Sequence, residues 1–196
     1  IAVDARIVLN RAYPSLERYA HMAIHPYPAH RVHEWQLADG TQVIIRPIRP
    51  EDAEIEREFV QGHSPESKYF RFMGTLRELT PQMLARFTQI DYDREMAFIA
   101  VTRSGGKEAE IGVGRYITNP DGESCEFAVV IADAWQGRGI AGRLMTELIA
   151  VAREKRLKQM MGHILASNSR MLKFVEELGF TLSHDPSDPT VKRAVL

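Results

Sequence analysis

Three glycines open a predicted helix directly after an apolar segment of the chain. Gly137, Gly139 and Gly142 follow the apolar run 126–131, and the backbone at a glycine can approach a ligand closely. The first N–H groups of a helix have no partner within the helix, so together with the helix dipole they bind phosphate oxygens. Arg138 can add a charge-assisted contact to the same anion. The segment therefore predicts an anion site, and the alternative is a tight strand-to-helix connection without a ligand.

Glu126 is the one charged residue in the apolar run 126–131. A carboxylate at the head of an apolar strand costs free energy unless it is hydrated, paired or used. Partial burial makes such a group a better base near neutral pH. Glu126 is therefore the candidate general base, and the alternative is a glutamate that faces water where the strand begins.

Two other side chains near this segment have reactive groups. Cys125 precedes Glu126, but no histidine in the sequence stands ready to activate its thiol, which favours a small buried core residue. His163 lies in the predicted strand 160–165 and is the nearest alternative acid, although a hydrogen-bonded core histidine is the favoured interpretation.

The composition limits the class of protein. Of 196 residues, 44% are hydrophobic and 26% are charged, which is typical of a folded, water-soluble domain. Lys and Arg number 25 against 26 Asp and Glu, and the net charge of −1 argues against nucleic-acid binding. No apolar run approaches the ~20 residues of a membrane-spanning helix, and no secretion signal opens the chain. A single cysteine cannot form an internal disulfide, so a cytoplasmic protein is predicted.

Apolar periodicity and turn residues predict the elements that position these groups. Asp39-Gly40 marks the turn of a hairpin between 34–37 and 42–46. Helices are predicted to begin at Pro50, Thr80 and Gly139, and a further helix is predicted over 170–178. The remaining strands are predicted at 98–101, 111–117, 126–131, 160–165, 180–182 and 191–196. Mixed strands and helices in this order predict an α/β or α+β sheet domain from Glu34 to the end of the chain.

The first 33 residues have a different character. Residues 1–9 are predicted to form a strand, and the absence of an initial methionine indicates a fragment of a longer protein. Residues 10–33 contain three prolines and are predicted to be a linker. Four histidines in this linker could form a metal site, but solvated side chains are favoured because no regular face aligns them; they are His21, His25, His30 and His33.

The glycine segment matches neither the dinucleotide fingerprint nor a Walker loop. Gln136-x-x-Gly139-x-Ala141 instead resembles the acyl-CoA pyrophosphate motif, Q/R-x-x-G-x-G/A, of the GNAT superfamily of N-acetyltransferases. Asn168-Ser169-Arg170-Met171 and Leu178-Gly179-Phe180 resemble the second signature of this family, and the order of elements matches from about Glu34 to Leu196. The resemblance implies a GNAT fold, with a mixed, mostly antiparallel sheet, flanking helices, and a cleft where the strands at 126–131 and 160–165 splay apart.

The resemblance also implies a site that binds acetyl-CoA without a metal. The family precedent places the pantetheine arm against Val129, Val130 and Ile131, and brings Asn168 from the opposite wall. Glu126 is the implied general base for the attacking amine, and a backbone N–H of its strand stabilises the oxyanion. Many members protonate the leaving thiolate with a tyrosine, but Val175 occupies that position here. The diphosphate is assigned to the loop and first helical turn, which are Gln136, Gly137, Arg138, Gly139, Ile140, Ala141 and Gly142.

A closer resemblance is to the bacterial, Pat-type protein lysine acetyltransferases, which fuse a GNAT domain to an NDP-forming acyl-CoA-synthetase-like region. The segments that carry it are His21–Pro28 and Cys125–Val130, and residues 1–9 are similar to the terminal strand of an ATP-grasp region. This implies that residues 1–33 are a remnant and linker of the synthetase-like region and that residues 34–196 form the GNAT domain.

The implied activity is transfer of an acetyl group to a lysine of a protein, with an acyl-CoA synthetase as the expected partner. Three alternatives remain open, namely a GNAT enzyme acting on a small amine, a non-catalytic acyl-CoA sensor and an inert interaction domain.

Overall fold

The computed structural model describes residues 25–74, 76 and 78–196, which build one sheet with helices on both faces. The strands are β1 (His33–Gln36), β2 (Gln42–Pro47), β3 (Glu95–Ser104), β4 (Lys107–Thr118), β5 (Ser124–Ile131), β6 (Gln159–Leu165), β7 (Thr181–His184) and β8 (Val191–Val195). The α-helices are α1 (Ala53–Gln61), α2 (Pro65–Phe72), α3 (Pro81–Thr88), α4 (Ile140–Glu154) and α5 (Ser169–Glu177). Short 3₁₀ turns are η2 (Ala29–Arg31), η3 (Pro50–Asp52) and η4 (Asp133–Trp135).

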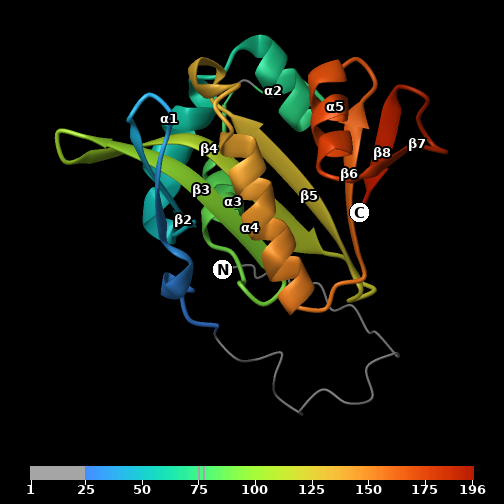
Figure 1. The fold of residues 1–196 in the computed structure, drawn as a ribbon, viewed down its shortest axis with the longest axis horizontal. Helices are drawn as coiled ribbons and strands as arrows, with labels where there is room; N and C mark the ends of the chain where they lie inside the picture. Colours follow the sequence, from blue (N-terminus) through green and yellow to red (C-terminus); the bar gives the residue numbers. More distant parts are fainter. Residues whose placement is uncertain (1–24, 75, 77) are drawn as a thin grey trace.

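The eight strands follow the order β1-β2-β3-β4-β5-β6-β8-β7 (Figure 1). All neighbouring pairs are antiparallel except β5 and β6, which are parallel and are connected through α4. This arrangement confirms the predicted mixed, mostly antiparallel sheet with flanking helices.

β3 lies inside the sheet and is buried on both of its faces. Phe98 and Ala100 pack in the core that includes α4, whereas Ile99 and Val101 pack in a second core with α1 and α3. Successive side chains of a strand point to opposite faces, so an apolar run without alternation is expected where helices cover both. Figure 1 shows α4 across one face of the sheet, with α1 and α3 on the other.

α4 is positioned by an apolar stripe. Ile140, Leu144 and Leu148 recur every fourth residue, and none of them is more than 1% exposed. This spacing places the three side chains on one helical face, which packs against β3, β4 and β5. The first turn of the helix is thereby held at the end of β5.

The sequence predicted most elements but missed α2. The hairpin of β1 and β2, the later strands and the helices α1, α3, α4 and α5 lie where the patterns placed them, with boundaries that differ by a few residues. In α2 no residue is fully buried, so no clear apolar stripe marks it. Its start does have a local signal, because the Ser64 side chain accepts from the Ser67 N–H and Pro65 occupies the first turn.

The predicted strand over residues 1–9 and most of the linker over 10–33 lie outside the described residues. From His25 onward the chain packs on the sheet domain. The Tyr27 hydroxyl donates to the Pro47 carbonyl at 3.0 Å, and the Tyr27 ring meets the Tyr92 ring edge-on. The boundary between linker and domain at residue 33 stays a prediction.

Two of the described linker histidines contact separate acidic residues. His25 faces Asp93 and His33 faces Glu147, each at 3.7 Å, while His21 lies outside the described residues. Across residues 25–74, 76 and 78–196, no group of three or more His, Cys, Asp or Glu side chains is arranged to hold a metal ion. Within the same residues, none of the helices combines the length and apolar character that crossing a bilayer requires.

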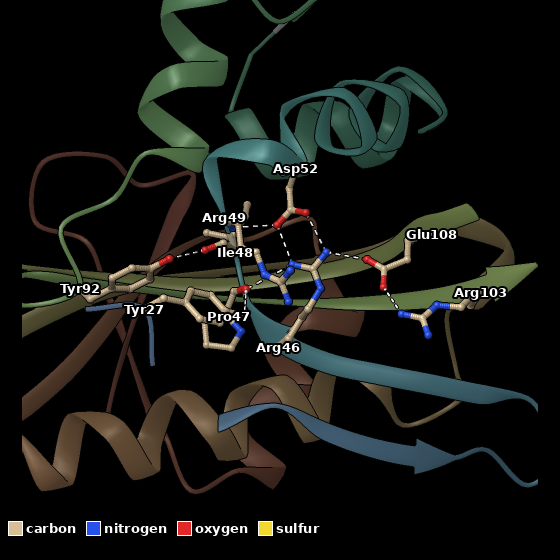
Figure 2. Close-up of polar contacts among 9 residues, drawn as sticks. All are labelled: Tyr27, Arg46, Pro47, Ile48, Arg49, Asp52, Tyr92, Arg103 and Glu108. Atoms are coloured by element: carbon tan, nitrogen blue, oxygen red, sulfur yellow. Dashed lines mark hydrogen bonds and ion pairs between the residues drawn. The ribbon is translucent and has the colours of Figure 1, made fainter. Parts of the chain in front are cut away.

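A buried arginine joins β2 to η3 and to the β3–β4 hairpin (Figure 2). Arg46 is 3% exposed and donates two hydrogen bonds of 2.7 Å to Asp52 and one of 2.8 Å to Glu108. Burial by itself lowers the pKa of Arg46, but the hydrogen bonds to Asp52 and Glu108 outweigh it and raise the pKa. Glu108 also accepts a hydrogen bond from Arg103, so the cluster contains two arginines and two carboxylates.

We expect Asp52→Ala to lower the free energy of unfolding by about 3 kcal/mol, because it leaves the buried Arg46 charge without its bidentate partner. Urea unfolding followed by circular dichroism measures this change. Glu54→Ala is the matched control, because it removes the carboxylate of the exposed Arg57–Glu54 pair, and it should barely move the midpoint. Equal midpoints for the two variants would contradict a structural role for the Arg46–Asp52 pair.

Candidate active site

A cleft opens where β5 and β6 part. The two strands pair at three positions, Ser124–Gln159, Cys125–Met160 and Glu126–Met161, and the register ends there. Beyond Glu126, β5 continues to pair with β4 on its other edge as far as Ile131. The described strands leave the β6-facing edge of Phe127–Ile131 unpaired, and a cleft of about 620 Å³ lies beside it. This volume is typical of a small-molecule site.

The glycine loop lies at one end of this cleft. Gly137 and Gly139 have φ angles of 76° and 84°, a left-handed conformation that strongly favours glycine. Gly139 is the N-cap of α4, and Arg143 is the first residue whose backbone N–H bonds back to it. Among the described residues, no hydrogen-bond acceptor is present for the backbone N–H groups of 137–142. The loop can therefore bind an anion in the way that the sequence predicts.

The structure brings most of the predicted cofactor residues together. The cleft is lined by Val129, Val130, Ile131, Gln136, Gly137, Gly139, Ile140, Ala141, Gly142 and Asn168. Two predicted residues are not part of this lining. Glu126 borders the cleft through a contact with His163, and Arg138 points elsewhere.

The Arg138 side chain, which the sequence predicts to contact a phosphate, pairs with other residues in the structure. Its guanidinium donates to Asp39 at 2.7 Å and lies over the Trp135 ring at 4.8 Å. The long-range contact to the β1–β2 turn could not be predicted from the glycine motif. It draws the side chain of Arg138 away from the cleft.

Arg170 of α5 lines the cleft, as does Arg71 of α2, and the sequence analysis assigned neither of them a role. Nη1 of Arg170 donates to the Gln136 side chain at 2.5 Å, which links α5 to the glycine loop. Arg170 stands in the first turn of α5, where the helix dipole disfavours a positive charge. The sequence did contain a sign of this role. A positive charge in the first turn of a helix is unfavourable by itself, and a nearby anion site would offset that cost.

Asn168 begins α5 on the opposite wall. Its Oδ1 accepts the Met171 N–H at 3.1 Å, so the residue is the N-cap of the helix. The carbonyl oxygen is occupied by this bond, and the side-chain amide N–H groups are the part that a ligand could contact. Val175, at the position of the family's tyrosine, is fully buried, whereas the neighbouring Phe174 lines the cleft.

Helix α2 forms a further part of the cleft wall and is anchored to η4 by Asp133. The Asp133 carboxylate accepts hydrogen bonds from the Ser64 N–H at 2.7 Å and from the Ser67 hydroxyl at 2.5 Å. Burial raises the pKa of Asp133, but these hydrogen bonds outweigh burial and lower it. Gln136 donates to the same carboxylate at 3.3 Å, so one acidic residue connects α2 to the glycine loop.

Glu126 lies at the last paired position of β5, where the strands diverge. Its side chain is 52% exposed, so the structure leaves about half of this carboxylate side chain in contact with solvent. Nδ1 of His163 lies 3.1 Å from Oε1 of Glu126, and Nε2 of His163 lies 3.3 Å from Oδ2 of Asp185. His163 lines the cleft and is not the core histidine favoured from the sequence.

Cys125 is fully buried in the core, as predicted. Burial raises the pKa of its thiol to about 12, which disfavours the thiolate that a nucleophile needs. The arrangement beside Glu126 therefore fits direct attack by a substrate and gives no support to an acyl-cysteine.

Comparison with known proteins agrees with this geometry. The model of the acetyltransferase (GNAT) domain family matches residues 42–181. Acetyltransferase PA5475 of Pseudomonas aeruginosa is 42% identical over 154 residues, which are 79% of this chain and 83% of that protein. Acetyltransferase Pat of Mycolicibacterium smegmatis is 28% identical over 145 residues, which are 74% of this chain and 43% of that protein.

Among solved structures, the GNAT domain of S. lividans PAT is similar to this chain. It has a TM-score of 0.78 and 32% sequence identity, and the match covers 87% of this chain and 99% of that domain. The similarity therefore extends over the whole fold that carries the cleft.

We expect Gly139→Ala to lower the free energy of unfolding by about 1–2 kcal/mol, because an alanine is strained at a φ of 84°. Gly142→Ala is the matched control within the same loop and helix. No atom lies within 4 Å of a Cβ at Gly142, and its backbone is helical, so this change should stabilise by about 1 kcal/mol. Urea unfolding without ligand measures both, and a shift of the same sign in the two variants would contradict the assigned loop conformation.

Proposed function

We propose that this chain, which belongs to the GNAT family of acetyltransferases, transfers the acetyl group of acetyl-CoA to the side-chain amine of a lysine in a protein. The observation that carries the proposal is that one strand, β5, connects a site for the donor's diphosphate with a carboxylate that can act as a base. β5 carries the exposed carboxylate of Glu126 near its start and is followed by a loop with free backbone N–H groups, and its unpaired edge runs between them.

The protein acceptor rests on the resemblance to Pat-type enzymes, and two of the similar proteins carry that name. Acetyltransferase Pat of M. smegmatis is 28% identical to this chain, and the GNAT domain of S. lividans PAT is 32% identical and shares the fold. We propose an acyl-CoA synthetase as the acceptor, and a synthetase-like region as the covalently linked neighbour of residues 34–196. Both rest on the resemblance of the linker and of Cys125–Val130 to Pat-type enzymes.

The binding end of the site is formed by the loop and by α5. The N–H groups of residues 137–142 and the positive end of α4 receive the diphosphate of the donor. Arg170 supplies the positive charge that the sequence analysis had assigned to Arg138. Val129, Val130 and Ile131 present an unpaired strand edge along which an extended amide-containing arm can form backbone hydrogen bonds.

The reacting end is formed by Glu126. A lysine amine has a pKa near ~10.4 and is almost wholly protonated at neutral pH, so a base must take its proton before it can attack. Acetyl-CoA supplies the acetyl group as a thioester, whose carbonyl carbon the free amine attacks. An N–H of the unpaired β5 edge stabilises the negative charge that develops on the carbonyl oxygen. When the tetrahedral intermediate collapses, the nitrogen loses its second proton and the C–S bond breaks. Because Val175 has no acidic group, this proton reaches the leaving thiolate through water.

We expect Glu126→Gln to lower the rate of acetyl transfer by about 10²–10⁴-fold, because the variant has no base to take the ammonium proton. Labelled acetyl-CoA is incubated with lysine-containing peptides, with purified acyl-CoA synthetases and with spermidine, and the labelled product is counted. Thermal stabilisation by acetyl-CoA should persist in the variant, since a ligand stabilises the state that it binds.

Glu123→Gln is the matched control, because this exposed turn residue pairs with Lys158 away from the cleft and should keep the wild-type rate. Transfer to spermidine but to no peptide or protein would replace the proposed substrate class by small amines. Stabilisation by acetyl-CoA without transfer to any acceptor would indicate a sensor, and no stabilisation at all would indicate an interaction domain.

The two arginines near the loop provide a second test. We expect Arg170→Ala to weaken binding of CoA by about 10-fold or more, which corresponds to the loss of a hydrogen bond to a charged group. Arg138→Ala should leave the affinity almost unchanged, because its guanidinium is paired with Asp39 outside the cleft. Isothermal titration with CoA measures both affinities, and the reverse order would show that Arg138 turns into the cleft when the donor binds.

A further inference from the structure

Glu126 has a partner that the proposed mechanism does not yet use. The side chain of Glu126 is 52% exposed, that of His163 is 34% exposed, and that of Asp185 is 11% exposed. The three groups form a continuous row from the cleft to the β7–β8 connection, with the imidazole between the two carboxylates. A well-hydrated carboxylate is a weak base at neutral pH. A neighbouring group that stabilises the protonated form of Glu126 would make it a stronger base.

The Asp185 carboxylate is fixed by its own turn. One of its oxygens accepts from the Ser187 N–H at 2.8 Å and from the Ser187 hydroxyl at 2.5 Å, and the other faces Nε2 of His163. The hydrogen bonds from Ser187, and then the neighbouring His163, lower the pKa of Asp185. Asp185 is therefore an ionised acceptor, and it favours the form of His163 that carries its proton on Nε2.

This tautomer presents a lone pair on Nδ1 to Glu126. When the Glu126 carboxylate and the imidazole are both without the extra proton, two acceptors face each other at 3.1 Å. A single added proton converts this contact into a charge-assisted hydrogen bond. The pair thus gains a favourable interaction at the moment when Glu126 takes a proton.

The surroundings of His163 contain one further charged group close in register. Arg193 of β8 pairs with His163 in the sheet, and its Nη2 lies 3.9 Å from the sulfur of Met161. Glu126 from β5 and Asp185 from the β7–β8 connection lie within ion-pair distance of the ring, at 3.1 and 3.3 Å. The ring therefore lies between two carboxylates, with one guanidinium beside it in register.

We propose that His163, held by Asp185, shares through Nδ1 the proton that Glu126 takes from the acceptor amine. The inference rests on the proposed function. It extends the general base of that mechanism from Glu126 alone to the row of Glu126, His163 and Asp185. The substrate ammonium loses one proton to Glu126, and that proton is then held between Oε1 and Nδ1 while Nε2–H stays bonded to Asp185. Water removes it after transfer, so the row returns to its starting state. His163 acts through Glu126, and Asp185 positions His163.

The test is chemical rescue of His163→Ala. We expect this variant to transfer acetyl groups at least ~10-fold more slowly than the wild type, because it loses a part of the rate increase that the general base provides. Added imidazole should restore much of the loss, because it can occupy the vacated site and accept the proton. Pyrazole has nearly the same shape but is a far weaker base, and it should restore little. A role limited to filling space would be rescued equally by both.

Asp185→Asn provides a second, independent variant. An asparagine amide can donate to Nε2, which moves the imidazole proton to Nδ1 and turns the acceptor toward Glu126 into a donor. We therefore expect Asp185→Asn to lose activity to a similar extent as His163→Ala. His184→Ala is the matched control, because this exposed histidine one residue earlier contacts Lys192 and should keep the wild-type rate.

The outcomes separate the two proposals. Wild-type activity in His163→Ala, equal rescue by imidazole and pyrazole, or no recovery in imidazole overturns the shared proton and leaves the proposed function intact. A wild-type protein that acetylates none of the acceptors overturns the proposed function itself. Thermal stabilisation by acetyl-CoA, measured in each variant, shows that a loss of rate does not come from a loss of donor binding.

Discussion

The pairing of β5 with β6 stops after three positions, and the cleft depends on that stop. Directly beyond the last pair, the Phe127 ring lies on Gly162 of β6, where an added Cβ would come within 2.5 Å of the ring. The ring also packs against Phe180 at 5.0 Å between centroids, so it cannot move aside freely. A side chain at position 162 would collide with this ring, so a glycine is needed at the point where the strands part. If pairing continued, the backbone groups at this edge of β5 would form hydrogen bonds with β6 and would not be available to a ligand.

The same stop determines which side chains meet. Glu126 is the last paired residue of β5, and His163 stands two residues after its partner Met161 in β6. The strands begin to diverge between these positions, which leaves room for two polar groups in contact but exposed to the cleft. β6 continues to pair with β8 over Met161–Leu165, and the β7–β8 connection brings Asp185 to the far side of the ring. The row of three groups is a consequence of sheet topology.

Local sequence patterns were sufficient to predict the helices, strands and turns, but they were insufficient to predict the polar contacts between them. The apolar spacing of α4, the Asp39-Gly40 turn and the glycines of the loop each depend on neighbouring residues, and the structure has them as predicted. α2 was missed because it buries no complete side chain. The contacts Arg138–Asp39, Arg170–Gln136 and His163–Asp185 each join residues from different elements, and no local pattern could select these pairs.

β5 also fixes the distance between the two ends of the site. From Glu126 to Ile131 the strand advances by five residues, or about 17 Å at the usual rise of an antiparallel strand. Along this length it is paired without a register shift to β4, which is itself buried between α4 and α1. The separation between the anion end and the base is therefore set by a rigid element inside the sheet. The short turn η4 then joins the end of the strand to the glycine loop, and the hydrogen bonds of Asp133 to Ser64 and Ser67 fix this turn against α2.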